Sequence, residues 1–271
     1  MKLIILFKKN ENTSKYDILL LIGDDFMTNK VALVTGSSRG IGKACIIEFA
    51  KKGYNVVINY NKDKDRAEEL YNYITNNYKD IKVLCIQADV SKEQDCVNLI
   101  NQVVNEFGKI DVLVNNAGVV IDKSFSERTV EEFKNTLNTN LIGPFVLSRE
   151  VAKIMMKNKY GKIINISSTN AINAFSPEAV DYDTSKAGLI ALTKDLAIEY
   201  APYINSNAIA PGWVDTEMNA ELPKDFIEEE TEKIWLKRFA DPKEIANVVL
   251  FLSSDEASYV NGSVIVVDGG Y

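Results

Sequence analysis

Histidine is absent from the 271 residues of this sequence. Without an imidazole, the Ser-His-Asp and Cys-His modes of nucleophilic catalysis are excluded, and a zinc site would lack its usual ligands. Cysteine is also scarce: Cys45, Cys85 and Cys96 form no Cys-x-x-Cys pair, so we expect no metal site. This cysteine usage fits a reducing compartment, and we expect a cytoplasmic protein. Any proton transfer must therefore use other side chains.

Excess positive charge and long apolar runs are lacking too. The formal charge is −7 and the isoelectric point is about 4.9. Neither a nucleic acid nor an anionic membrane surface is therefore expected as the main partner. The runs KLIILF and DILLLIG near the N-terminus are too short to span a bilayer. With 46% hydrophobic and 25% charged residues, the composition is that of a soluble globular protein.

Residues 1–26 differ from the rest of the chain. They lack the long apolar centre and the small-residue cleavage site of a secretory signal. We interpret them as a loosely attached, unstructured extension or as the product of an upstream start codon, with Met27 as an alternative start. Residues 27–271 then form a single domain, because no repeat or low-complexity linker divides them.

From residue 30 onward, short β-branched runs alternate with amphipathic segments. This alternation predicts an α/β fold with a parallel sheet covered by helices on both faces. The expected strands are 31–36, 55–60, 82–89, 110–118, 161–168, 205–212 and 262–270, and the expected helices are 41–52, 64–76, 93–107, 130–157 and 182–201. Residues 213–241, rich in Glu and Lys, interrupt the pattern and are expected to form a substrate loop or lid.

A glycine-bearing turn follows the first strand of this domain. Gly36, Gly40 and Gly42 stand where the chain must turn tightly, approach a ligand and pack helix on strand. The helix that begins there directs free N–H groups and its positive dipole end at the turn, which favours a pyrophosphate. The spacing Gly-x-x-x-Gly-x-Gly departs from the commoner Gly-x-Gly-x-x-Gly.

The end of the second strand bears on the choice of nucleotide. An acid there would bind a ribose 2′-hydroxyl, but the sequence runs Asn59-Tyr60-Asn61-Lys62, and Arg39 can reach the same corner. A cationic corner without an acid favours NADP(H) over NAD(H). Asp63 follows closely, and a shift of one or two residues would reverse this interpretation.

Polar and small residues follow the next two strands. Asp89 and Val90 are suited to an adenine ring, through a hydrogen bond and an apolar contact. The segment NNAG (115–118) allows the backbone to lie close against a cofactor, because ligands bind at the carboxyl ends of such strands.

Tyr182 and Lys186 are placed four residues apart on an expected helix and share one face. An ammonium about 4 Å from a phenolate stabilises it by about 4 kcal/mol at an effective dielectric of 20. That energy corresponds to a fall of up to about three units in the tyrosine pKa. The lysine would then supply what histidine supplies in other enzymes. Such a spacing is also common on ordinary helix surfaces.

Two further polar residues add to this pair. Ser168 ends the strand before the helix, and its hydroxyl could bind a substrate oxygen, although serine also fills turns and caps. Asn140 lies inside a helical stretch, where asparagine is not favoured, and could bind water that leads to Lys186.

Together, TGSSRGIG (35–42), NNAG, Asn140, Ser168, the Tyr182/Lys186 pair and PGWVDT (211–216) resemble the short-chain dehydrogenase/reductase family, in order over residues 30–271. The resemblance implies a single-domain Rossmann-type sheet, a homotetramer, and hydride transfer between nicotinamide C4 and a carbonyl or alcohol carbon. By position, Tyr182 would be the acid/base, Ser168 the oxygen anchor, Lys186 the residue that lowers the tyrosine pKa and binds the ribose, and Asn140 the end of the relay. The expected cofactor contacts are Gly36, Ser38, Arg39, Gly40, Ile41, Gly42, Asn59, Tyr60, Asn61, Asp89, Val90, Asn116, Ala117, Gly118, Tyr182, Lys186, Pro211, Gly212, Val214 and Thr216.

Within this family the chain is similar to the β-ketoacyl-acyl-carrier-protein (3-oxoacyl-ACP) reductases, in the SRGIG turn and the ending SYVNGSVIVVDGG. Two features depart from them. Glu178 and Asp181 precede the tyrosine where those reductases are usually small and neutral, and Tyr203 stands near an expected docking arginine. Other cations, Lys157, Lys159 and Lys162, could contact an acidic carrier protein.

The resemblance predicts an NADPH-dependent reductase of 3-oxoacyl thioesters, as in fatty acid synthesis. One alternative is an NAD(P)-dependent alcohol, sugar or steroid dehydrogenase of the same family. Another is a non-catalytic nucleotide-binding protein on the same fold. Trp213, Met218 and Leu222 are placed either to line an acyl-binding surface or to pack within the fold.

Overall fold

The structure is a computed structural model that describes residues 3–9, 16–22, 30–217, 219 and 222–271. Seven of the described strands form a parallel sheet in the order β5-β4-β3-β6-β7-β8-β9. The strand order reverses between β3 and β6, which marks the point where doubly wound sheets bind ligands. The strands are β3 (Val31–Val34), β4 (Asn55–Tyr60), β5 (Val83–Gln87), β6 (Val112–Asn115), β7 (Gly161–Ile166), β8 (Ile204–Pro211) and β9 (Val264–Val267).

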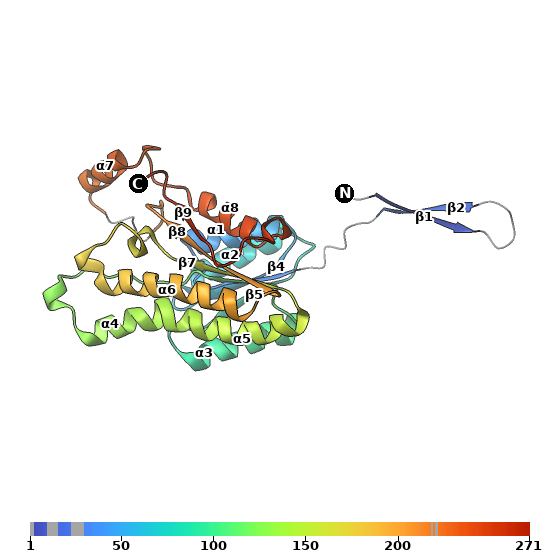
Figure 1. Cartoon of the computed structure of the whole chain (residues 1–271), viewed down its shortest axis with the longest axis horizontal. Helices are drawn as coiled ribbons and strands as arrows, with labels where there is room; N and C mark the ends of the chain where they lie inside the picture. Colours follow the sequence, from blue (N-terminus) through green and yellow to red (C-terminus); the bar gives the residue numbers. More distant parts are fainter. Residues whose placement is uncertain (1–2, 10–15, 23–29, 218, 220–221) are drawn as a thin grey trace.

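Helices cover both faces of the sheet, which confirms the predicted fold class (Figure 1). On one side lie α1, α2 and α8, and on the other lie α3 to α6. The helices are α1 (Gly40–Lys51), α2 (Lys64–Asn77), α3 (Glu93–Phe107), α4 (Val130–Leu137), α5 (Gly143–Asn158), α6 (Val180–Glu199), α7 (Lys224–Lys233) and α8 (Pro242–Leu252).

The strands from β5 to β8 in the sheet order contribute side chains to two separate hydrophobic cores, whereas β9 contributes to one of them. In β3, Ala32 and Val34 pack with α1, α2 and α8, whereas Val31 and Leu33 pack with α3 and α5. Successive side chains of a strand point to opposite faces, so a strand buried on both sides must be apolar throughout. This explains the uninterrupted apolar runs of the sequence.

The helix predicted over residues 130–157 is not continuous, so this prediction is wrong. Residues 130–157 form α4 and α5, separated by a π-helical turn at Asn138–Ile142. Thr129 and Glu132 form a capping box that starts α4. A π-turn inserts one residue into the helical hydrogen-bond pattern, so the side chain in the turn points in a new direction. That side chain is Asn140.

Two strands lie within residues 1–26, the segment interpreted as an unstructured extension. β1 (Leu3–Lys9) and β2 (Tyr16–Ile22) pair antiparallel, with Leu3 opposite Ile22, and form a sheet of their own. Met27, considered as an alternative start, lies outside the described residues. Within the described part of the chain, no helix combines the length and the apolar character needed to cross a bilayer.

Candidate active site

The glycine turn packs directly against the segment that follows β6. Gly36 has a φ of +60°, and a Cβ added to it would lie 2.9 Å from the Cα of Ala117. A Cβ on Gly42 would lie 2.6 Å from Nδ2 of Asn116. Asn116 in turn donates from Nδ2 to the carbonyl of Thr35 at 2.8 Å. Close packing therefore requires glycine at both positions, and at Gly36 the backbone conformation requires it as well.

Helix α1 begins at this turn with a free amino-terminal end. Arg39 occupies the N-cap position without a side-chain cap, and the first turn of α1 contains no acidic residue. Ser38 and Ile41 flank Arg39 and Gly40 there. The unpaired N–H groups and the helix dipole suit the pyrophosphate of a dinucleotide. Thr216 approaches from the loop after β8, 3.4 Å from a Cβ placed on Gly40.

Asn59, predicted to contact the cofactor, is buried and holds the turn in place. Its Oδ1 accepts from the N–H of Gly36 at 3.1 Å, and its Nδ2 donates to the carbonyls of Ile86 and Ala88 at 3.3 and 3.2 Å. These bonds occupy the side-chain amide. Asn59 therefore supports the nucleotide turn. Of the two residues after it, Tyr60 is buried in the hydrophobic core and Asn61 is exposed.

The corner at the end of β4 has the register that the sequence predicts. The strand ends at Tyr60, and Asp63 instead caps α2 by accepting from the N–H of Arg66 at 3.4 Å. The Asp63 carboxylate also forms an ion pair with Arg66 at 3.3 Å. Arg39 is exposed, and no hydrogen bond or ion pair of its guanidinium is found within residues 30–217, 219 and 222–271. At this corner the Arg39 guanidinium thus has no partner among the described residues, whereas the Asp63 carboxylate is paired with Arg66.

Asp89 and Val90 follow β5 as expected. Asp89 accepts hydrogen bonds from the N–H and the hydroxyl of Ser91 at 3.1 and 2.7 Å. Burial raises the pKa of Asp89, but the Ser91 hydrogen bonds and Lys92 outweigh it and leave the pKa below its ordinary value. Asp89 is therefore an ionised acceptor, and Val90 is a buried apolar neighbour.

Helix α6 brings Tyr182 and Lys186 together on one face. Nζ of Lys186 lies 5.5 Å from the ring centroid of Tyr182 and donates to the carbonyl of Ile166, at the end of β7, at 2.7 Å. Lys186 is buried. A cation at this distance over a ring is attracted to its face. The geometry predicted from the i, i+4 spacing is present.

The electrostatic effect predicted for this pair is not present. Burial raises the pKa of Tyr182 above its ordinary value; the Ser168 hydroxyl opposes the rise and Asp183 adds to it. Burial also lowers the pKa of Lys186 to about 8. The estimate of a fall of up to about three units treated the ammonium as the main influence, whereas removal of the phenol from water dominates. Tyr182 is consequently a protonated phenol at neutral pH.

Ser168 follows β7 and lies beside Tyr182. Its hydroxyl is close enough to lower the pKa of the tyrosine. The same hydroxyl accepts from the N–H of Asn170 at 3.2 Å and donates to Oδ1 of Asn170 at 3.2 Å. Ser168 therefore starts a short 3-10 turn (Thr169–Ala171) as well as facing the phenol. Both roles considered for it from the sequence are compatible with this position.

Asn140 is fully buried in the π-turn, and its side chain is held from two sides. Its Oδ1 accepts from the N–H of Val119 at 2.8 Å, while Nδ2 donates to the Val119 carbonyl at 2.9 Å and to Oγ of Ser185 at 3.0 Å. A Cβ placed on Gly118 would lie 3.4 Å from Nζ of Lys186 and 3.5 Å from Oδ1 of Asn140. Gly118, Asn140 and Lys186 are therefore neighbours, as the predicted relay requires.

The loop after β8 contributes the remaining predicted contacts. Pro211 ends β8, Gly212 donates from its N–H to the Val267 carbonyl at 3.0 Å, and Val214 forms a bridge with Ala240. The ring of Trp213 stacks on Phe239 at 5.4 Å and meets Phe226 of α7 edge-on at 5.6 Å. Trp213 thus packs α7 onto the loop. Met218 lies outside the described residues.

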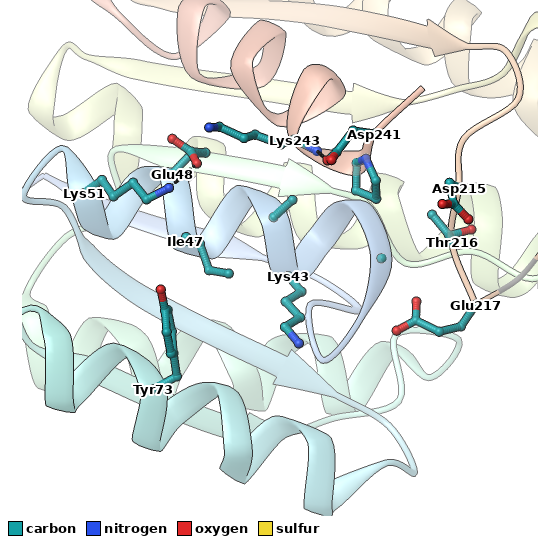
Figure 2. Close-up of a pocket in the computed structure, with 13 residues that line it drawn as sticks. Lys43, Ile47, Glu48, Lys51, Tyr73, Asp215, Thr216, Glu217, Asp241 and Lys243 are labelled. Atoms are coloured by element: carbon teal, nitrogen blue, oxygen red, sulfur yellow. Dashed lines mark hydrogen bonds and ion pairs between the residues drawn. The ribbon is translucent and has the colours of Figure 1, made fainter. Parts of the chain in front are cut away.

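A hollow of about 600 Å³ lies along the outer side of α1 (Figure 2). It touches the nucleotide turn at Gly40 and the loop after β8 at Thr216, and it also lies against Tyr73 of α2 and Lys243 of α8. Charges of both signs line it, including an ion pair of 2.6 Å between Lys51 and Glu48. None of the four predicted catalytic residues is among its lining residues, so it is separate from the proton-transfer site.

Two supporting residues were missed from the sequence. Thr35 accepts at Oγ1 from the N–H groups of Asn116 and Ala117, both at 3.0 Å, and fixes the NNAG segment. Ser185 joins Asn140 to α6 and donates to the carbonyl of Tyr182 at 2.7 Å. A small hydroxyl residue between Tyr182 and Lys186 was visible in the sequence, but its partner lies 45 residues away.

Comparison with known proteins decides the family. A family model described as enoyl-(acyl carrier protein) reductase matches residues 36–271. A 3-oxoacyl-(acyl-carrier-protein) reductase of Staphylococcus epidermidis is 41% identical over 244 residues, which cover 89% of this chain and 98% of that protein. A solved short-chain dehydrogenase/reductase of Serratia marcescens is 36% identical with a TM-score of 0.83, and the match covers 89% of this chain and 97% of that one. The chain belongs to the short-chain dehydrogenase/reductase family.

Membership establishes the class of chemistry. Short-chain dehydrogenase/reductases are oxidoreductases that act on CH–OH or C=O groups with a nicotinamide cofactor. The chain resembles their 3-oxoacyl-ACP reductases, but it is also 39% identical to glucose 1-dehydrogenase 2 of Bacillus subtilis over 248 residues, which cover 90% of this chain and 95% of that protein. The substrate is therefore a separate question from the family.

Proposed function

We propose that this short-chain dehydrogenase/reductase reduces the 3-oxo group of an acyl thioester with NADPH. When bound, the nicotinamide supplies the hydride that the carbonyl carbon receives. Tyr182 gives its phenolic proton to the carbonyl oxygen, and the product is a 3-hydroxyacyl thioester. Ser168 holds that oxygen, Lys186 holds the ribose, and Asn140 links Lys186 to the route by which the proton is replaced.

Exposed apolar side chains on two segments that adjoin Asn140 and Ser168, together called the apolar rim, carry the proposal. Two segments flank the site: 119–130, which contacts Asn140 through Val119, and 172–175, which follows Ser168. Large apolar side chains on both are exposed, including Ile121 at 57%, Phe125 at 66% and Phe175 at 67%. A polyol needs hydrogen-bonding side chains around it, whereas a fatty acyl arm needs apolar surface. The rim therefore favours an acyl substrate. Its members are Val119, Ile121, Phe125, Val130, Ile172 and Phe175.

The protonation state of Tyr182 is compatible with carbonyl reduction. Reduction of a carbonyl requires a proton donor, and oxidation of an alcohol requires a proton acceptor. Burial raises the pKa of Tyr182, so the phenol keeps its proton at neutral pH. A protonated tyrosine beside Ser168 is ready to donate.

The cofactor preference rests on the corner after β4. Arg39 is exposed, and the acid that follows β4, Asp63, forms an ion pair with Arg66 and caps α2. The 2′-phosphate of NADPH would find a cation there, and the 2′-hydroxyl of NADH would lack the usual carboxylate acceptor. We therefore propose NADPH as the reductant, with NADH as a poorer one.

The lysines considered as a docking surface for acyl carrier protein lie far from Ser168. Lys157, Lys159 and Lys162, considered as a docking surface for acyl carrier protein, lie at the end of α5 and the start of β7. Ser168 follows the opposite end of β7, about 20 Å away for a six-residue strand. Lys162 is moreover buried and donates to Oδ1 of Asn205 at 2.8 Å. These lysines do not face the active site, so a carrier protein would have to dock elsewhere.

A homotetramer, implied by the family resemblance, is proposed as the assembly. Apolar side chains exposed on α5 and α6, including Phe145 at 42% and Ile198 at 78%, offer surface for a second copy. Light scattering with size-exclusion chromatography measures the assembly directly.

A sugar or alcohol dehydrogenase is the second candidate, favoured by the identity to glucose 1-dehydrogenase 2. A substrate panel separates the two. Acetoacetyl-CoA, acetoacetyl-ACP, crotonyl-CoA and glucose are each tested with both nicotinamides in the appropriate oxidation state. The proposal expects acetoacetyl thioester reduction with NADPH to exceed the other rates at least tenfold. Faster oxidation of glucose overturns it, and faster reduction of crotonyl-CoA would indicate C=C chemistry. No turnover of any substrate, with nucleotide still bound, would indicate a non-catalytic nucleotide-binding protein.

A further inference from the structure

A buried ion pair connects segment 119–130 of the apolar rim to the start of α6. Nη1 of Arg128 lies 3.4 Å from Oδ2 of Asp181, and the side chains are only 3% and 0% exposed. Asp181 is one of the two acids that set this chain apart from related reductases in the segment before the tyrosine. Its burial shows that this charge is not part of a docking surface. It faces inward.

Asp181 is bonded to the start of α6 and to α4. Its Oδ2 accepts from Oγ1 of Thr136 on α4 at 2.6 Å. Its Oδ1 accepts from the N–H of Tyr182 at 3.1 Å. The carboxylate therefore fixes the backbone of the proton donor itself. A displacement of Asp181 would displace Tyr182.

Arg128 also connects its own segment, 119–128, to the residues just before α6. Its Nη2 donates to the carbonyl of Ile121 and to the carbonyl of Glu178 at 2.7 Å. The N–H of Lys123 donates to the carbonyl of Glu178 at 3.0 Å. Segments 119–128 and 176–181 are thus joined through one guanidinium and one backbone hydrogen bond.

The buried charges of Arg128 and Asp181 compensate each other. Nε and Nη1 of Arg128 are buried without a hydrogen-bond partner. In the described part of the chain, Asp181 is the carboxylate within ion-pair distance of this guanidinium. Loss of either partner would leave an uncompensated charge in a buried position, which is far more costly than loss of an exposed pair.

We propose that Arg128 and Asp181 are positioning residues, which hold Tyr182 and segment 119–128 in the arrangement needed for proton transfer. The inference rests on the proposed role of Tyr182 as proton donor. It assigns a role to Asp181, the acid directly before Tyr182. Small displacements of a reacting group are known to cost as much as about 100-fold in rate.

Three variants test the pair. Asp181→Asn removes the charge and keeps one of the two acceptor oxygens that Tyr182 and Thr136 use. Arg128→Met keeps the approximate length of the side chain, and a third variant carries both changes. Arg238→Met is the matched control, because Arg238 forms a bidentate pair with Glu244 at 2.6 and 2.7 Å that is exposed. Each protein is assayed well below its melting temperature.

If the proposal is correct, the variants lower kcat and leave binding of NADPH and substrate nearly unchanged. Arg128→Met lowers kcat by about 10-fold to 100-fold, and Asp181→Asn lowers it by a smaller factor. The Kd for NADPH and the KM for the carbonyl substrate stay within about twofold. The double variant falls no further than Arg128→Met, because both changes act through one contact. Arg238→Met keeps the parent kcat. A loss of melting temperature with unchanged kcat in both single variants, or effects that multiply in the double variant, would overturn the proposal.

Hydrogen exchange gives a readout that needs no substrate. The amides of Lys123 and Tyr182 should lose protection in Arg128→Met and Asp181→Asn but not in Arg238→Met; unchanged protection would overturn the inference. If the parent protein oxidises glucose and does not reduce thioesters, the proposed function fails while kcat on glucose still tests the pair. If the parent protein turns over neither glucose nor thioesters, hydrogen exchange alone shows whether Arg128 and Asp181 hold the two segments together.

Discussion

Lys186 lies over the ring of Tyr182 and donates a 2.7 Å hydrogen bond to the carbonyl of Ile166. The ammonium is thereby fixed at the end of β7, between the tyrosine and the position expected for the nicotinamide ribose. In a chain without histidine, this phenol and this ammonium are the groups that can exchange protons in the site.

Substitution Tyr182→Phe removes the proton donor and leaves the ring in place. We expect kcat to fall by about 1,000-fold, within the range known for loss of a general acid. The Kd for NADPH, measured by nucleotide fluorescence, should change less than threefold. Tyr203→Phe, at a partly exposed tyrosine beyond the end of α6, is the control and should retain parent activity. Near-parent turnover of Tyr182→Phe would exclude it as the donor.

The pH dependence of kcat/KM should report Lys186. Burial lowers the pKa of Lys186 to about 8, so the ammonium is present below that pH and is lost above it. Tyr182 stays protonated over the same range because its pKa is raised. We therefore expect kcat/KM for carbonyl reduction to be level near pH 7 and to fall as the pH rises through about 8. Lys186→Arg should remove this limb, since arginine keeps its charge. A level profile from pH 7 to 9.5 in the parent would contradict the assignment.

Arg39 should discriminate between the two nicotinamide cofactors. Arg39→Ala is expected to weaken NADPH binding by at least about tenfold, the effect of losing a hydrogen bond to a charged group. NADH binding should change less than twofold. Lys52→Ala removes an exposed cation at the other end of α1 and should affect neither. Isothermal titration with both nucleotides measures the difference, and equal losses would show that Arg39 does not read the phosphate.

Gly42 tests the close packing of the nucleotide turn. A Cβ at this position would lie 2.6 Å from Nδ2 of Asn116 and 2.8 Å from the carbonyl oxygen of Gly36. Although alanine favours a helix, Gly42→Ala should lower the free energy of unfolding by about 1–3 kcal/mol through overpacking and should weaken nucleotide binding. At Gly108, with a φ of +72° and open space around its Cβ position, alanine should reduce stability but leave nucleotide binding unchanged. Urea unfolding and nucleotide titration separate the two effects.

Local patterns were sufficient to predict much of the fold and part of the site. The boundaries of β4 and α3 match the expected ranges, because apolar periodicity and helix signals act within a few residues. The juxtaposition of Tyr182 and Lys186 follows from helix geometry alone. The order of the strands, and the meeting of Ser168 with Tyr182, required the resemblance to a family.

Features that depend on distant contacts were not predictable in this way. The π-turn at Asn140 is tied to Val119 and Ser185, which lie 21 and 45 residues away. The raised pKa of Tyr182 results from burial, which no spacing between two residues reveals. The pairing of Asp181 with Arg128 likewise joins residues that are far apart in the sequence.

The packing of Trp213 between Phe226 and Phe239 makes the chain suitable for optical measurement. The sequence has two tryptophans, and the second, Trp235, is 82% exposed. A Trp235→Phe protein would carry a single indole emitter, hydrogen-bonded at 2.9 Å to Glu230 on α7. Its emission wavelength and quenching by acrylamide would follow the seating of α7 in real time, without any attached dye.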